Sequence, residues 1–394
     1  MKILVLDFRI YSIEYEIFEM PEGREVCRGV IEHIGFEQSV LSHHSGGKSE
    51  KAASSAPNHT EGLKFILATL ESRENIVPQR DIFAVGHRVV HGGWSFTSPV
   101  IIDPGVKKEI YNDFLIAPIH NPYNFMGIEA SEKLMPGKPN VAVFDTSFHQ
   151  TMPEVAYRYA LPERVFNEYK IRKYGFHGIS HKYVAERTAA LLGKKSADII
   201  SFHLGAGSSA CAIKDGNSID TSMGFTPLEG LAMTNRTGDI DAGVLLYLLK
   251  SGWSAEELES CINKESGTCG ISGISGGMKE IVEAADAGDK KAALALDIFV
   301  YRARKYLGAY YFLLGGEADA IAFTGGIGEN SALLRGRILG GCEKFGIILD
   351  NKLNLGAVGT EGIISGEKSK IKIFVLPKNE KVIIAVETLK LVKK

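Results

Sequence analysis

The 394-residue sequence lacks any uninterrupted apolar run near the roughly 18 residues that a membrane helix needs. Its apolar start, residues 3–6, meets Asp7 and Arg9 too early for a signal peptide. An excess of one charge is also missing, because 45 Lys+Arg stand against 47 Asp+Glu, and this balance disfavours a nucleic-acid binder. We therefore expect a cytoplasmic protein that binds neither membranes nor nucleic acid.

Cysteine is scarce, and no C-x-x-C pair occurs among Cys27, Cys211, Cys261, Cys269 and Cys342. This odd, scattered set is typical of a reducing compartment, and we expect these residues to be small members of the core. Glycine is abundant by contrast, with 43 residues, several of them directly after short apolar runs. Such placement favours an α/β architecture with anion sites built from backbone N–H groups.

The hydrophobic pattern predicts two halves. Segments 2–7, 12–20 and 25–34 are apolar with rough alternation and predict a three-stranded meander, followed by a loop over 42–60 and a helix over 61–72. A similar layout recurs after residue 150. The remaining expected strands are 82–85, 141–144, 199–204, a hairpin over 211–220, 320–323 and 371–376, and the expected helices are 241–251, 255–264, 277–287, 290–314, one from about 330 and one from about 382. Two such halves imply a cleft between them.

Three glycine-rich segments are candidates for binding phosphate. Residues 46–49 (GGKS) resemble the end of a P-loop, but the required first glycine is Ser42, so a solvated loop is the better interpretation. Residues 203–209 and 325–330 each follow a predicted strand, where successive N–H groups converge on phosphate oxygens. Together these two turns favour a nucleotide or phosphate site over plain packing.

No histidine occurs after residue 203, although the chain has 11. The pairs His87/His91 and His177/His181 have the spacing of a helical zinc site, but both lack the glutamate of H-E-x-x-H and lie next to glycines, which disfavours zinc. Arg88 and Arg236 lie in glycine-bearing segments, where a guanidinium suits a carboxylate or phosphoryl group. A structural ion pair is the alternative for either arginine.

Long strings of the sequence resemble one known family. They are residues 85–93 (VGHRVVHGG), 117–122 (APIHNP), 144–149 (FDTSFH), 174–181 (YGFHGISH), 220–230 with 236–241, and 323–330 (FTGGIGEN). In this order they resemble the acetate and propionate kinases, within the superfamily of sugar kinases, heat-shock chaperones and actin. The resemblance runs from about residue 29 to the C-terminus.

The resemblance implies two similar α/β domains, residues 1–149 plus 380–394 and residues 150–379, with the active-site cleft between them. It implies reversible transfer of the γ-phosphoryl group of ATP to acetate or propionate, giving an acyl phosphate and ADP, with Mg²⁺ as cofactor, in a homodimer. By similarity, the catalytic residues would be Arg88, His120, Asp145, His177 and Arg236; the acyl pocket Val90, Ile119, Phe176 and Pro227; the nucleotide site His203, Gly205, Gly207, Gly325, Gly326, Ile327, Gly328 and Asn330; and the metal ligands Asp7 and Glu380.

The chain departs from the family pattern on the nucleotide side. The family has Asn-x-Gly-Ser-Ser-Ser-x-Lys where this chain has residues 7–14, so that Arg9 replaces a glycine and Glu14 replaces a lysine. If Glu14 faced the cleft, its charge would repel ATP. Other departures are Ala206, Gly277-Met278-Lys279, Lys378 and Lys381. Two alternatives therefore stay open: a homologue that binds nucleotide or acyl phosphate without turnover, and a relative that uses another phosphoryl donor such as pyrophosphate.

Overall fold

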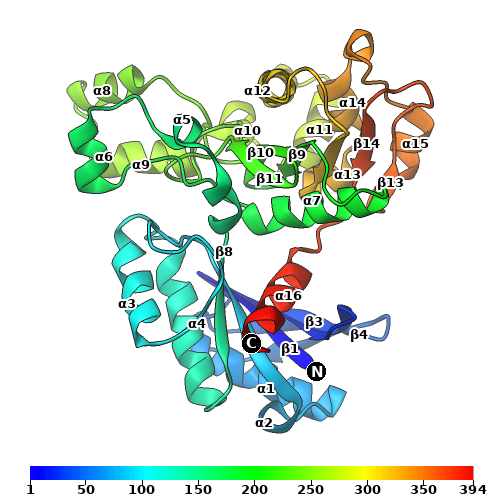
Figure 1. Ribbon diagram of the computed structural model, residues 1–394. Helices are drawn as coiled ribbons and strands as arrows, with labels where there is room; N and C mark the ends of the chain where they lie inside the picture. Colours follow the sequence, from blue (N-terminus) through cyan, green and yellow to red (C-terminus); the bar gives the residue numbers. More distant parts are fainter. Residues whose placement is uncertain (394) are drawn as a thin grey trace. The chain divides into compact units, whose positions relative to one another are not determined.

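The computed structural model describes residues 1–393 and divides into two compact units, each with its own sheet (Figure 1). Unit 1 comprises Met1–Phe148 and the segment from Asn379 onward, and unit 2 comprises His149–Lys378. Among the described residues, no helix combines the length and the apolar composition required to cross a membrane.

Unit 1 is built on an eight-stranded sheet with the strand order β5-β4-β3-β2-β1-β6-β8-β7. Its strands are β1 (Lys2–Arg9), β2 (Ser12–Glu19), β3 (Arg24–Glu32), β4 (Ser39–Ser45), β5 (Lys48–Ser54), β6 (Ile82–Val89), β7 (Val100–Ile101) and β8 (Asn140–Phe144). Its helices are α1 (His59–Glu74), α2 (Pro78–Asp81), α3 (Pro104–Asn112), α4 (Asn121–Leu134) and α16 (Glu380–Val392), with a 3₁₀ turn at Asp113–Leu115.

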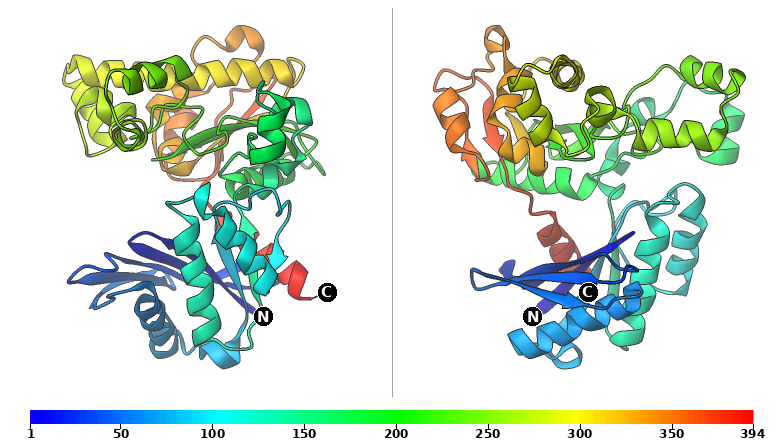
Figure 2. Two further views of the ribbon diagram at one scale, coloured as in Figure 1. Left: turned by 90° about the vertical axis from the view of Figure 1, so that its left-hand side faces the viewer. Right: turned by 180° about the vertical axis from the view of Figure 1, so that it is seen from behind.

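The two faces of this sheet follow from the alternation of side chains along β1. Leu4, Leu6 and Phe8 pack with apolar residues of α1 and α4 in one core cluster. The intervening residues point to the other face, which α16 covers (Figure 2). Gly86 of β6 lets α16 approach, because an added Cβ there would lie 2.4 Å from Oγ1 of Thr388.

Unit 2 is built on a six-stranded sheet with the order β11-β10-β9-β12-β14-β13. Its strands are β9 (Ile199–Leu204), β10 (Ser208–Lys214), β11 (Asn217–Thr221), β12 (Ala320–Thr324), β13 (Gly362–Ile363) and β14 (Lys372–Val375). Its helices are α5 (Glu154–Tyr157), α6 (Glu163–Tyr169), α7 (Gly178–Leu191), α8 (Ala242–Lys250), α9 (Ala255–Lys264), α10 (Gly267–Ser272), α11 (Met278–Asp286), α12 (Lys290–Leu313), α13 (Gly325–Asn330), α14 (Ala332–Leu339) and α15 (Asn351–Gly356), with 3₁₀ turns at Ser147–Thr151 and Glu343–Phe345.

The two sheets repeat one topology. In unit 1 the antiparallel strands β3-β2-β1 are followed by β6 and β8, both parallel to β1. In unit 2 the antiparallel strands β11-β10-β9 are followed by the parallel strands β12 and β14. This repeat confirms the predicted class of two similar α/β domains. The buried apolar residues of α12 pack on Ile200, Phe202 and Leu204 of β9, which is typical of a helix that faces the core.

The structure corrects several sequence predictions. The segment 42–60 is not a loop: β4 and β5 form a hairpin there, and α1 begins at His59. Gly46 and Gly47, both with positive φ, form its two-residue turn. Strand β6 continues to Val89, so Gly86 and Arg88 lie in a strand and not beside a turn, and α13 occupies the expected glycine turn at 325–330. Of the five cysteines, Cys261 and Cys269 are only partly buried.

Candidate active site

The charged residues of unit 1 gather where three parallel strands end. In the pairing of β1 with β6, Leu6 lies opposite His87, and in that of β6 with β8, Val89 lies opposite Phe144. The carboxyl ends of these strands therefore meet at one edge of the sheet, which is where α/β sheets bind ligands. Asp7, Arg88 and Asp145 lie at this edge.

Arg88 is held between two carboxylates. Its Nη1 donates to Oδ2 of Asp7 at 3.1 Å, its Nε donates to Oδ1 of Asp145 at 3.3 Å, and its Nη2 donates to Oδ2 of Asp145. Burial disfavours the charged guanidinium, but the adjacent carboxylates outweigh burial and hold the pKa of Arg88 well above its ordinary value. Both ends of its planar fork are fixed, so the side chain has one defined position.

Arg9 and Lys381 neutralise the acidic residues of the opening hairpin. Arg9 donates to Asp7 at 2.9 Å and pairs with Glu14 at 2.8 Å, and Lys381 donates to Glu14 at 2.7 Å. Burial alone would raise the pKa of Asp7, but Arg88, Arg9 and Lys381 bring it well below its ordinary value. The expected repulsion between Glu14 and ATP is thereby reduced, since two cations engage this carboxylate. Lys381 is distant from Glu14 in the sequence, so its pairing with Glu14 could not be predicted from the neighbouring residues.

The other predicted residues of unit 1 lie on different elements and differ in exposure. Glu380 is the first residue of α16, and its charge acts on Arg88. Val90 is buried and its N–H donates to Asn124 Oδ1 at 3.0 Å. His120 occupies the N-cap position of α4 and is partly exposed, and Ile119 is exposed.

In unit 2 the two glycine turns lie side by side. Strands β9 and β12 are parallel neighbours, with His203 opposite Thr324, so the turn at 205–207 and the start of α13 share one edge of the sheet. Gly325 has a φ of 79°, and a Cβ there would lie 2.6 Å from the carbonyl oxygen of Leu204. Only glycine fits this close approach. Gly328 also packs against Leu204, whereas Gly326 is exposed and meets nothing within 4 Å.

His177 and Arg236 converge at the first of these turns. A Cβ on Gly207 would lie 3.4 Å from Nε2 of His177 and 3.6 Å from Nη1 of Arg236. The ring of His177 stacks on His203 with the centroids 4.2 Å apart. The backbone of His177 is left-handed, with a φ of 55°, and such strained non-glycine residues concentrate at functional sites.

Arg236 differs from Arg88 in its partners. Its Nη1 donates to the backbone oxygen of Pro227 at 3.2 Å, and burial lowers its pKa. Within residues 1–393 no carboxylate pairs with it. Arg236 is partly buried, and a partly buried cation without a paired carboxylate is a site where an anion can bind.

Serine hydroxyls orient the histidines, and no motif in the sequence pointed to these serines. Nδ1 of His177 lies 3.0 Å from Oγ of Ser209, Nδ1 of His203 lies 2.8 Å from Oγ of Ser180, and Nε2 of His181 lies 2.8 Å from Ser209. Burial lowers the pKa of His149 to about 4 and that of His181 well below its ordinary value. The histidine cluster thus combines residues of helix α7, strand β9 and the connecting segments, and serine hydroxyls orient several of the rings.

The repeated α/β fold, with glycine turns and arginines at the strand ends, defines a class of two-domain phosphotransferases. A family model described as "Acetokinase family" matches residues 2–386, and the chain belongs to this family. It is 45% identical over 396 residues to an acetate kinase of Finegoldia magna, with all of both chains covered. Structures of an acetate kinase from Porphyromonas gingivalis (42% identity) and a propionate kinase from Francisella tularensis (36% identity) both superpose with a TM-score of 0.93 over 99% of each chain. The chain is therefore a kinase with a carboxylate as its acceptor.

Proposed function

We propose that the protein reversibly transfers the γ-phosphoryl group of ATP to acetate or propionate, with Mg²⁺, giving an acyl phosphate and ADP. The observation that carries the proposal is Arg236, a partly buried cation without a carboxylate partner among the described residues, beside His177 and two adjacent glycine turns. A neutral or cationic substrate group would not need this arrangement, whereas the negatively charged phosphoryl group needs it in the transition state.

The chemistry requires charge neutralisation more than proton transfer. A carboxylic acid with a pKa near about 4.3, by analogy with Glu, is ionised at neutral pH, so the nucleophile needs no strong general base. The barrier arises because two anions must approach each other. Fixed cationic donors lower this barrier without having to reorganise.

The residues of unit 1 would act on the acceptor and the metal. Arg88, held by Asp7 and Asp145, would bind an oxygen of the carboxylate, and His120 would support the same charge. Asp145 would keep Arg88 in position.

The donor set of unit 1 fits Mg²⁺. The carboxylates Asp7, Glu14, Asp145 and Glu380 outnumber the cations Arg9, Arg88 and Lys381 by one. Carboxylate oxygens are ligands that Mg²⁺ prefers. Arg9 and Arg88 engage Asp7, and the charge of Glu380 acts on Arg88, so both predicted ligands belong to this charged group. When bound, the ion would neutralise charge on the phosphates.

The residues of unit 2 would act on the transferred group and the nucleotide. Arg236 and His177 would donate to the equatorial oxygens of the phosphoryl group. His203, Gly205 and Gly207 would lie along the phosphates, and Gly325, Gly326, Ile327, Gly328 and Asn330 would face adenosine. The adjacency of the two turns at one sheet edge supports this assignment.

The acyl group would contact Val90, Ile119, Phe176 and Pro227. Val90 and Phe176 are buried apolar residues, which suits a methyl group or a slightly longer chain. One methylene gives only about 1–3 kcal/mol of discrimination, so acetate and propionate would both react and differ in rate.

A different phosphoryl donor is the second candidate. It is favoured by the opening hairpin, where Arg9 takes the place of a glycine and binds Asp7. A side chain there leaves less room for the backbone to approach phosphate. Neutralisation of Glu14 argues for ATP instead.

Self-association as a homodimer is part of the proposal. Helix α8 has no buried residue, although it carries Val244, Leu246, Tyr247 and Leu249, all exposed. An apolar helix exposed in this way marks an interaction surface. Sedimentation should give twice the mass of one chain, and Leu246→Glu should shift it to the monomer; a monomeric wild type would refute this part.

The test of the reaction is acyl-phosphate formation, trapped as the hydroxamate, with acetate, propionate and butyrate against ATP, GTP and pyrophosphate. We expect turnover with ATP and with acetate or propionate. Turnover with pyrophosphate but not with ATP or GTP would show that the altered hairpin accompanies the use of another phosphoryl donor. No turnover from folded protein that binds ADP would support the non-catalytic homologue.

A further inference from the structure

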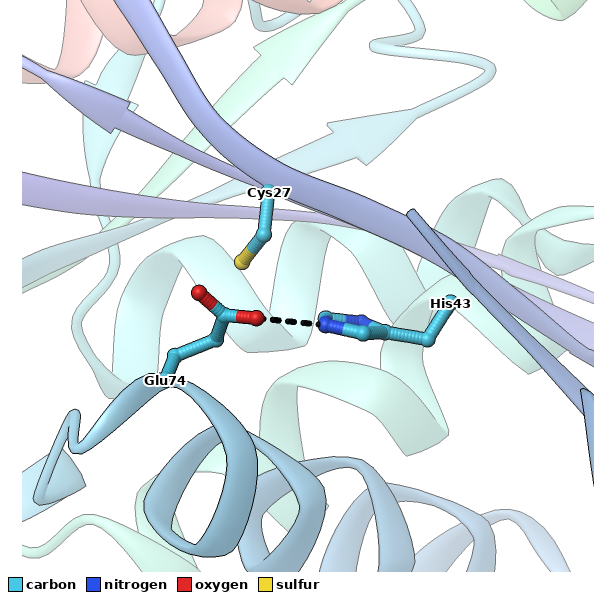
Figure 3. Close-up of side chains that lie close together, drawn as sticks. All are labelled: Cys27, His43 and Glu74. Atoms are coloured by element: carbon cyan, nitrogen blue, oxygen red, sulfur yellow. Dashed lines mark hydrogen bonds and ion pairs between the residues drawn. The ribbon is translucent and has the colours of Figure 1, made fainter. Parts of the chain in front are cut away.

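A cysteine, a histidine and a glutamate meet in unit 1 between the neighbouring strands β3 and β4 and the end of α1. Cys27 lies on β3, His43 on the neighbouring β4, and Glu74 is the last residue of α1 (Figure 3). One ligand atom from each, Sγ, an imidazole nitrogen and a carboxylate oxygen, lies within 4.8 Å of the other two. Cys27 and His43 are buried.

Two hydroxyls orient this cluster. Oη of Tyr15 lies 2.6 Å from Nδ1 of His43, and Ser45 donates to Oε2 of Glu74 at 2.9 Å. These contacts turn Nε2 of His43 and Oε1 of Glu74 toward each other, 2.8 Å apart. A histidine whose second nitrogen is fixed by a polar group is the arrangement seen around metal-binding histidines.

We propose that Cys27, His43 and Glu74 bind one Zn²⁺ ion, with water as the fourth ligand. Thiolate, imidazole and carboxylate together form a donor set that suits Zn²⁺ and is unsuited to Mg²⁺ or Ca²⁺. The site would connect the neighbouring strands β3 and β4 to the end of α1.

Binding needs a small movement of two ligands, a change of tautomer at His43 and the release of one proton. With Zn–N and Zn–O bonds near 2.0–2.1 Å in a tetrahedron, the two ligand atoms stand about 3.3 Å apart, so Nε2 and Oε1 must separate by a few tenths of an ångström from 2.8 Å. The neutral His43 ring carries its one proton on Nδ1 in the bound state, where Tyr15 accepts the hydrogen bond, and the free Nε2 binds zinc. The Cys27 thiol releases its proton to solvent.

An open cavity of about 480 Å³ borders His43, Ser45 and Glu74. Through it Zn²⁺ would reach the site, together with the water that is the fourth ligand. Its wall also holds Arg73 paired with Glu50, so this cation is already neutralised. The site is independent of the candidate active site. Tyr15 lies opposite Leu6 and packs in the α1 cluster, whereas Asp7 points to the other face of the sheet.

The test uses the full chain, stripped with a chelator and titrated with Zn²⁺ against a chromogenic competitor. We expect one Zn²⁺ per chain, and affinity lowered at least about tenfold in Cys27→Ser and His43→Gln, with a loss of about tenfold in Tyr15→Phe. The matched controls are His44→Gln, on the opposite face of β4, and Cys342→Ser in unit 2, which should bind as the wild type does.

Co²⁺ gives a direct spectroscopic readout of the thiolate ligand. In the wild type we expect a thiolate-to-cobalt charge-transfer band, and its loss in Cys27→Ser. Zn²⁺ should also raise the unfolding temperature of the wild type and leave that of Cys27→Ser unchanged. Wild-type affinity equal to that of Cys27→Ser, or a cobalt spectrum without the thiolate band, would overturn the proposal and leave a Tyr15–His43–Glu74 hydrogen-bond chain.

Discussion

Replacing Arg236 with methionine should separate activity from stability. In the wild type, the Arg236 side chain donates one hydrogen bond to a backbone oxygen, that of Pro227, at 3.2 Å. Such a bond contributes about 1 kcal/mol net to stability. Removing a partly buried cation that has no carboxylate partner among residues 1–393 offsets this loss. We therefore expect the free energy of unfolding to change by less than about 1 kcal/mol.

Activity should respond very differently. A preorganised donor to charge that develops in the transition state contributes about 10²–10³ in kcat, or roughly 3–4 kcal/mol. The assay is the initial rate of acyl-phosphate formation with saturating ATP, beside urea unfolding of the same preparations. Arg164→Met, at an exposed position, is the control for loss of a charge.

Arg88→Met provides the opposite case. It leaves Asp7 and Asp145 buried without their shared cation, which costs about 3–5 kcal/mol of stability. The reasoning about Arg236 would be refuted if Arg236→Met unfolded as readily as Arg88→Met, or kept its full rate; either result would make Arg236 a structural residue.

Three further predictions follow from the contacts. Gly325→Ala should lower the free energy of unfolding by about 1–3 kcal/mol, because its Cβ would lie 2.6 Å from the oxygen of Leu204, whereas Gly326→Ala should be tolerated; equal effects in urea unfolding would contradict this. Lys381→Met should raise the KM for ATP about three- to tenfold by freeing part of the charge on Glu14, and Glu14→Gln in that background should restore it; an unchanged KM would show that Glu14 does not act on ATP. His149 has a pKa of about 4 in the folded protein, so the unfolded chain binds a proton there more readily. Its contribution to the free energy of unfolding is fully present above pH ~6.5, and about 3 kcal/mol is lost as the pH falls through about 4. Nitrogen NMR showing protonation near pH 6.5 in the folded protein would disprove this.

The sequence predicted the elements whose pattern is local. The alternation in residues 12–20 and the apolar runs at 199–204 and 320–323 correspond to β2, β9 and β12. The hairpin at 42–60 was missed because β5 is an exposed edge strand of polar residues, which has no apolar face to show a period. The signal that was present, Gly46-Gly47, is a common two-residue hairpin turn.

The candidate site shows the same division between local and non-local signals. Motifs singled out Arg88 and Arg236 equally, yet only the structure distinguishes a paired arginine from one that lacks a carboxylate. One of the two partners of Glu14, Lys381, is 367 residues away, and no pattern near Glu14 could have indicated it. The serines that orient His177 and His203 come from α7 and β10 and have no distinctive spacing.

The most direct test of the central claim is ³¹P NMR of the purified protein with ATP, Mg²⁺ and acetate. The account predicts that ADP and acyl phosphate appear in equal amounts, and that ATP re-forms when ADP and acyl phosphate are supplied instead. ADP that accumulates with inorganic phosphate and no acyl phosphate, or no reaction until pyrophosphate replaces ATP, would contradict it.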